Sequence, residues 1–183
     1  MPTILTHAVV PLALGLGAGR RYVSGPLVAA GVVASMLPDL DVLAFRLGVS
    51  YADQFGHRGF SHSVLFALLL GAVACLLAGR LRSSRSGAFA FVFVAAVSHG
   101  LLDMFTTGGL GVALLWPLSE ARFFTPWQVI EVSPLSLSRV FGPRGLAVVL
   151  SELKWVWGPA VLVASVLALV VRARRAVPVT PFR

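Results

Sequence analysis

Five stretches of this sequence are nearly free of charge and approach the length that crosses the hydrocarbon core of a bilayer, about 20 residues. A soluble domain of 183 residues has too little interior for this composition, in which 57% of residues are hydrophobic and only 12% are charged. The chain is therefore predicted to be an all-α, polytopic transmembrane helical bundle. The expected membrane segments cover residues 3–19, 26–45, 62–79, 87–105 and 155–171.

The whole chain, residues 1–183, is expected to form one membrane-embedded domain. The apolar stretch 110–118 is too short to span a bilayer, so a re-entrant or interfacial position is expected for it. Residues 120–154 form the longest polar connection, and residues 155–171 are expected to supply the last membrane helix.

The basic residues gather in short clusters between the apolar runs. The formal net charge is +8, and its main contributors are Arg20 with Arg21, the stretch 80–85 and the stretch 172–175. Such clusters are typical of the cytoplasmic ends of transmembrane helices. They explain the charge without a nucleic-acid partner, and they predict an outward N-terminus and an inward C-terminus.

Seven ionisable side chains lie inside the apolar runs or at their ends, where such groups are costly and usually mark function. In the five-segment topology all of them fall at the outer side of the bilayer. Random placement would scatter them between both sides. We therefore expect them to converge on one site as metal ligands. These residues are His7, Asp39, Asp41, His57, His62, His99 and Asp103.

Two of the motifs have a clear local geometry. His99 and Asp103 are four residues apart, so on a helix they share one face and can bind one ion, or one can orient the other. Asp39 and Asp41 follow Pro38, which disfavours continued helix for the residue before it. The two carboxylates can converge only on an irregular segment, which at membrane depth must line a cavity.

A third motif places His57 and His62 on either side of a turn that leads into an apolar run. Ser61 can cap the helix that follows, and the free amides of a helix start favour an anion. Arg58 lies between the two histidines, and a guanidinium suits a phosphate oxygen. This combination suggests a phosphorylated substrate.

The set of nitrogen and oxygen ligands exceeds what a single tetrahedral zinc ion needs. It would suit two divalent ions, each with room for water or substrate. Imidazole with carboxylate fits zinc first and also manganese or iron, and no thiolate site is available because Cys75 is alone. A single histidine at a membrane edge is more often an interfacial polar residue, so the metal interpretation depends on the convergence of all seven.

These motifs together resemble the LexA-regulated, YdjM-like family of membrane-bound metal-dependent hydrolases. The resemblance covers residues 1–119 and implies a bacterial inner-membrane hydrolase that needs a metal. The family name implies control by the DNA-damage repressor and does not imply DNA binding by the protein. The motifs that carry the resemblance are His7 and the stretches 38–41, 57–63, 98–103 and 115–118.

A looser similarity is to zinc-dependent phospholipase C and to the single-strand nucleases that share its all-helical fold. Those enzymes hydrolyse phosphate esters with a metal cluster held by histidines and aspartates, including a His-x-x-x-Asp pair. His99 and Asp103 match that pair, and Asp41 with His57 would supply the bridging region. The similarity implies two ions at most.

The expected function is hydrolysis of a phosphate ester in a membrane lipid or another amphipathic substrate, at the periplasmic face, by a metal-activated water. Asp39, Asp41 and Asp103 are the candidate catalytic carboxylates, and any of them can serve as general base. Arg58 is expected to hold a phosphoryl oxygen. Membrane lipids are the expected partners.

Three alternatives remain open from the sequence. A transporter of metal ions or protons would distribute its polar residues through the bilayer, whereas these lie near one side. A non-catalytic scaffold would hold a structural metal in closed coordination. A hydrolase of an acyl ester or an amide would use the same ligands on a different substrate.

Overall fold

The computed structural model describes residues 1–133 and 141–176, and these ranges are helical, with isolated β-bridges and no strand. Helix α3 continues directly into an irregular 3-10 segment, η1, and helix α7 continues through a π-helical turn, η3, into α8. The elements are α1 (Ile4–His7), α2 (Val9–Ala18), α3 (Gly25–Met36), η1 (Leu37–Leu47), η2 (Phe60–His62), α4 (Val64–Leu76), α5 (Arg85–Met104), α7 (Pro143–Glu152), η3 (Leu153–Trp157) and α8 (Gly158–Ala176).

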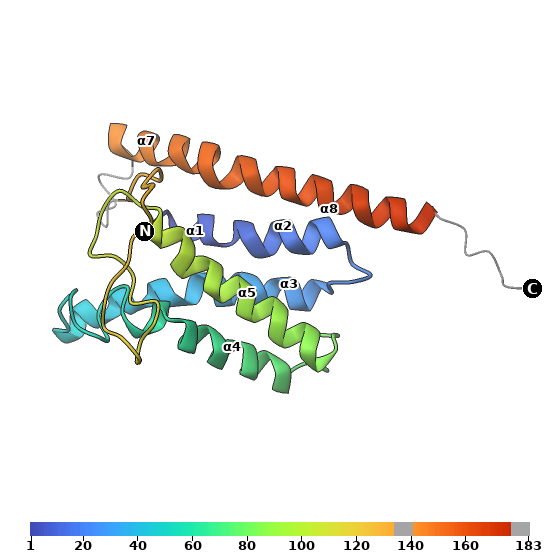
Figure 1. Cartoon of the computed structure of the whole chain (residues 1–183), viewed down its shortest axis with the longest axis horizontal. Coiled ribbons are helices and arrows are strands. Elements are labelled where there is room, and N and C mark those ends of the chain that lie inside the picture. Colours follow the sequence, from blue (N-terminus) through green and yellow to red (C-terminus); the bar gives the residue numbers. More distant parts are fainter. Residues whose placement is uncertain (134–140, 177–183) are drawn as a thin grey trace, which may run out of the picture.

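The predicted all-α membrane bundle is confirmed. Three helical stretches, Gly25–Leu47, Arg85–Met104 and Pro143–Arg174, are long and apolar enough to cross a bilayer, and Ile4–Ala18 and Val64–Leu76 are shorter apolar helices. Helix α5 packs against α3 and α4, and α2 packs against α3 and α8. In Figure 1 these helices lie along the length of the bundle, with successive helices running in opposite directions and α5 inclined across α3.

The last helical stretch begins earlier than residue 155, where the sequence predicted it to start. It begins at Pro143, directly after Gly142, a position at which the fixed φ of proline favours the first turn. The stretch reads as polar because of its charged residues, but Gly145, Val148 and Glu152 share a buried face at helical spacing. Residues 134–140 of the predicted polar connection lie outside the described residues.

The two ends of the bundle differ in character. In Figure 1 the turns 19–24 and 77–84 lie at one end, together with the end of α8. Segment η1, the loop 48–59 and the long connection after α5 gather at the other end, beside the N-terminus. The basic clusters and the histidine motifs are therefore at opposite ends, as predicted from the sequence. Which end faces the cytoplasm stays a prediction.

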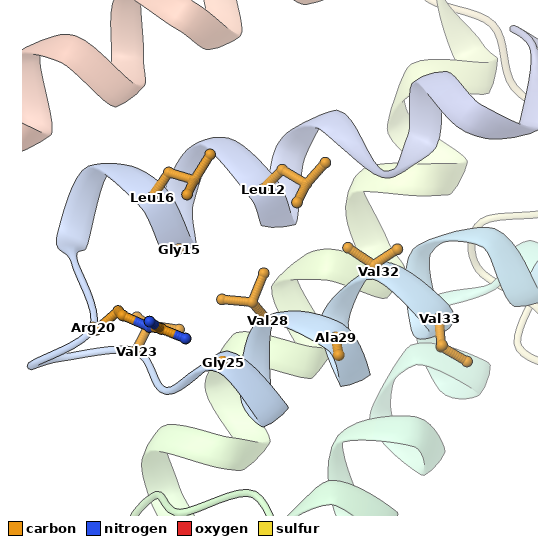
Figure 2. A pocket seen from close by; sticks show the side chains of 10 residues that line it. All are labelled: Leu12, Gly15, Leu16, Arg20, Val23, Gly25, Val28, Ala29, Val32 and Val33. Carbon is orange, nitrogen blue, oxygen red and sulfur yellow. The ribbon is translucent and has the colours of Figure 1, made fainter.

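An apolar groove of about 660 Å³ runs between α2 and α3 (Figure 2). Leu16 and Val33 line it and are largely exposed, and Arg20 lies across the end of the groove nearest the turn. Exposed apolar side chains of this kind are expected where helices face lipid chains. The groove lies away from the histidine motifs.

Small residues bring the helices close together, as is common in membrane bundles. Gly17 on α2 is the tightest such position against α8. A Cβ atom there would lie 2.8 Å from the carbonyl oxygen and 3.0 Å from the Cα atom of Ala164. Backbone atoms cannot rotate away, so the close approach of α2 and α8 requires glycine.

Gly17→Ala is expected to lower the free energy of unfolding by about 1–3 kcal/mol, because the added methyl group forces two helices apart. Thermal unfolding in detergent, followed by circular dichroism, measures the change. Gly79→Ala is the matched control, since a Cβ there meets nothing within 4 Å. Equal stability of the two variants would contradict the packing described for α2 and α8.

Candidate metal site

All seven predicted ligands lie at one end of the bundle and are brought together from four segments. Helix α1 supplies His7, η1 supplies Asp39 and Asp41, and α5 supplies His99 and Asp103. The loop before α4 and the short η2 turn supply His57 and His62. All except Asp41 are buried at 3% exposure or less, and the Asp41 side chain is 7% exposed.

Four of these residues, Asp39, His62, His99 and Asp103, form a central cluster in which one ligand atom from each lies within 4.8 Å of the others. The Nε2 atoms of His62 and His99 are 2.9 Å apart. Nε2 of His62 is 3.4 Å from Asp103 Oδ2, and Nε2 of His99 is 3.5 Å from Asp39 Oδ1. Two atoms that share one zinc ion lie within about 4.2 Å of each other, because each bond is about 2.0–2.1 Å. The spacing therefore fits ligands of a shared ion.

His7 lies against this cluster. Its ring stacks on the ring of His99 with centroids 3.7 Å apart. Its Nε2 atom is 3.7 Å from Asp39 Oδ2 and 3.7 Å from Asp103 Oδ1. His7 thus contacts both carboxylates, and helix α1 completes the cluster from the N-terminal side.

The donors of the cluster fit a bound cation. Both nitrogens of His7 and both oxygens of Asp39 and Asp103 are buried without a hydrogen-bond partner among the described residues. Arg58 compensates part of this charge, because its Nε atom lies 3.0 Å from Asp103 Oδ2, but a second buried carboxylate without a cation costs several kcal/mol. A divalent cation between these groups would satisfy the carboxylate oxygens and the inward-facing imidazole nitrogens at once. The cluster can therefore hold a metal ion.

Contacts outside the cluster orient its two closest histidines. Nδ1 of His99 lies 2.7 Å from the backbone carbonyl oxygen of Ser35. A carbonyl only accepts, so Nδ1 carries the proton and Nε2 turns its lone pair to the cluster. Nδ1 of His62 lies 3.2 Å from Asp41 Oδ2. Partners of this kind are typical of histidines that bind metals.

Asp41 and His57 lie beside the central cluster. Asp41 Oδ1 is 2.6 Å from Nδ1 of His57, and Asp41 Oδ2 accepts a hydrogen bond of 2.7 Å from the Ser61 hydroxyl. Asp41, His57 and His62 form a second group with ligand spacing. The two groups share His62, whose Nδ1 atom faces Asp41 and whose Nε2 atom faces Asp103.

Arg58 is fully buried, with φ at 65°, and its guanidinium contacts Asp103, Thr106 and Gly108. Nε lies 3.0 Å from Asp103 Oδ2, Nη1 donates to the Gly108 carbonyl and Nη2 donates to the Thr106 hydroxyl, both at 2.9 Å. A Cβ atom on Gly109, whose φ is +100°, would lie 2.7 Å from Nη1. These contacts differ from the expected phosphate contact, because no edge of the guanidinium reaches the surface.

The electrostatic potential within the cluster favours a positive charge. Carboxylate oxygens of Asp39, Asp41 and Asp103 lie 3.9, 3.2 and 3.4 Å from the ring nitrogens of His62. Three carboxylates around one imidazole give an excess of negative charge around the ring. The same excess favours a cation.

Two groups near the cluster were not predicted from the sequence. The Met1 amino group lies 4.0 Å from Asp103 Oδ1, and burial lowers its pKa to about 6 despite the attraction of Asp103. Glu152 is buried on α7 and accepts a hydrogen bond from Thr6, the neighbour of His7. Its helical spacing from Val148 was the available signal.

Comparison with known proteins places the chain among inner membrane proteins. The family described as "YdjM inner membrane protein" matches residues 1–176. Inner membrane protein YbcI of Escherichia coli (strain K12) is 50% identical over 170 residues, which cover 91% of this chain and 97% of YbcI. The predicted family is confirmed over nearly the whole chain.

More distant relatives match part of the chain. Inner membrane protein YdjM of Escherichia coli (strain K12) and that of Shigella flexneri are each 34% identical over 98 residues, covering 50% of this chain and 49% of theirs. No solved structure matches the chain. The relatives are named for the inner membrane, and three helical stretches here can cross a bilayer, so the predicted localisation is also confirmed. The chain belongs to the YdjM family of inner membrane proteins.

Proposed function

We propose that this protein is a membrane-bound, metal-dependent hydrolase of a phosphate ester at the bilayer surface. The observation that carries the proposal is the set of buried ligand atoms of His7, Asp39 and Asp103, which form no hydrogen bond among the described residues and lie near Nε2 of His62 and His99. Ionisable groups at membrane depth are rare outside functional sites. Hydrolysis is the reaction that the resemblance to metal-dependent hydrolases implies.

We assign the central cluster to one divalent cation, with zinc as the first choice. Asp39, His62, His99 and Asp103 would hold it, with His7 alongside, and mixed imidazole and carboxylate ligation suits zinc. A second ion at Asp41 and His57 would also need Nδ1 of His62, so that ring would have to lose both protons. We therefore propose one ion. The expectation of two ions is tested by measuring the metal content of the protein.

A divalent cation held by these residues would lower the pKa of a water molecule to about 7 and would polarise the phosphoryl group. Asp41 Oδ1 lies 2.6 Å from Nδ1 of His57, and a proton held on Nδ1 leaves Nε2 free to accept one. We assign proton transfer to this pair. Arg58 holds Asp103 in place through Nε and holds the loop at Thr106 and Gly108.

Two apolar hollows at the same end of the bundle support a substrate with a hydrocarbon chain. Their volumes are about 400 and 220 Å³, and Leu102 and Trp155 line both of them. Leu102 and Phe105 flank Asp103 in the chain, and the cluster residues themselves line neither hollow. Trp127 is 73% exposed, as expected for an interfacial aromatic residue. A phospholipid or a similar amphipathic phosphate ester fits this surface, and the positive-inside rule puts it at the periplasmic face.

Metal content tests the site directly. Detergent-purified protein is expected to contain about one equivalent of zinc, manganese or iron, and His99→Ala and Asp103→Asn are expected to lose it, since each removes a ligand. Elemental analysis of size-exclusion peaks measures this. Arg21→Gln, at the opposite end of the bundle, is the control. Protein that stays empty after reconstitution with each ion would exclude the proposal.

A variant of His57 distinguishes a site with one ion from a site with two ions. His57→Gln is expected to keep the metal of the wild type and to lower kcat by about 10²-fold or more, because it removes the proton acceptor. Elemental analysis and turnover are measured on the same preparation. A fall from two metal equivalents to one would instead assign His57 as a ligand of a second ion.

The reaction itself is tested with phospholipids in mixed micelles. Release of phosphate, a phosphorylated head group or diacylglycerol is expected from the wild type, and loss of release is expected in Asp103→Asn and after chelation. Mass spectrometry of the products identifies the bond that breaks. Release of fatty acid would instead support an acyl-ester hydrolase, and activity that survives both treatments would refute metal dependence.

A further inference from the structure

Glu152 is a buried carboxylate that the proposed reaction does not use. It is 3% exposed and stands at the end of α7, where the helix widens into the π turn of η3. Single π turns inside helices are frequent at functional sites. Among the described residues no lysine or arginine forms an ion pair with it, so its burial is compensated by hydrogen bonds alone.

Those hydrogen bonds come from the N-terminal segment. Oε2 of Glu152 accepts from the Thr3 hydroxyl at 2.8 Å and from the Thr6 hydroxyl at 2.7 Å, and Oε1 accepts from the Thr3 backbone amide. The Trp157 indole, one turn further along, donates to the Thr6 hydroxyl at 3.1 Å. Glu152 on α7 therefore fixes the start of α1.

Helix α1 is the first turn of the helical stretch Ile4–Ala18, and Ala8 alone separates it from α2. The amide groups of a first turn have no partners inside the helix, so they depend on groups outside it. Thr3 is the N-cap of α1 but makes no side-chain cap, so the carboxylate of Glu152 takes over that role for its amide. His7 directly follows Thr6, and its imidazole points from the same turn to Asp39 and Asp103.

We infer that Glu152 is a positioning residue that places His7 in the metal cluster through Thr3 and Thr6. The inference rests on the proposed metal site, although the contacts themselves join Thr6 and Glu152, which are 146 residues apart in the sequence. Loss of Glu152 would free the first turn of α1. The His7 ring would then lose its fixed place against His99 and both carboxylates.

The test compares Glu152→Gln with Val148→Ala, a buried position one turn earlier on the same face of α7. Glutamine keeps the volume but turns an NH₂ donor towards groups that donate. Zinc affinity, measured by chelator competition in detergent, is expected to weaken about 10–100-fold in Glu152→Gln, as for other residues that orient ligands. Val148→Ala, which only weakens packing, is expected to keep wild-type affinity.

A second readout does not depend on the metal. In metal-free protein labelled with ¹⁵N-histidine, the His7 imidazole signals are expected to change in Glu152→Gln and to stay in place in Val148→Ala. Thr6→Val, which removes the hydroxyl between Glu152 and Trp157, is expected to act like Glu152→Gln and serves if that variant does not fold. Unchanged affinity and unchanged His7 signals would overturn the inference, while a metal-free wild type would overturn only the proposed metal site.

Discussion

The cost of burying two carboxylates, those of Asp39 and Asp103, is the constraint on which the rest of this structure depends. Both lie at the end of an apolar bundle, and neither has a hydrogen-bond partner among the described residues. Their neighbours are groups that can hold positive charge or donate: the guanidinium of Arg58, the amino group of Met1 and three imidazoles. The loops at this end supply residues that contact the two carboxylates. The opposite end of the bundle has no comparable cluster in the described residues.

Much of the fold could be predicted because membrane helices are set by local composition. An apolar run of suitable length forms a helix wherever it lies in the chain, and Pro38 alone indicated that the second run becomes irregular, as it does in η1. The early start of the last helix at Pro143 was missed. Its first turns are amphipathic, and their buried face is visible only once the partner surface near Thr6 is known.

The convergence of the seven residues could be predicted from the sequence, but their arrangement relative to one another could not. The order of the membrane segments decides at which side of the bilayer each helix end lies. All seven residues lie at helix ends on one side, and this was enough to expect that they converge. Which nitrogen of His62 faces Asp41 and which faces Asp103 depends on how η2 turns against α5. The same holds for Arg58, whose backbone at φ 65° turns the side chain inward to Asp103 and Thr106. Both orientations depend on tertiary contacts between segments that are far apart in the sequence, so residue spacing does not predict them.

The donors of the cluster come from α1, η1, η2 and α5, segments that meet only in the folded bundle. The unfolded chain has no comparable arrangement, so an ion held there would be thermodynamically linked to folding. By that linkage, free ion at 100 times its dissociation constant adds about 2.7 kcal/mol to the stability of the native state. The cation would then hold the four segments together at this end of the bundle. The free energy of unfolding would increase with the concentration of free metal on that side of the membrane.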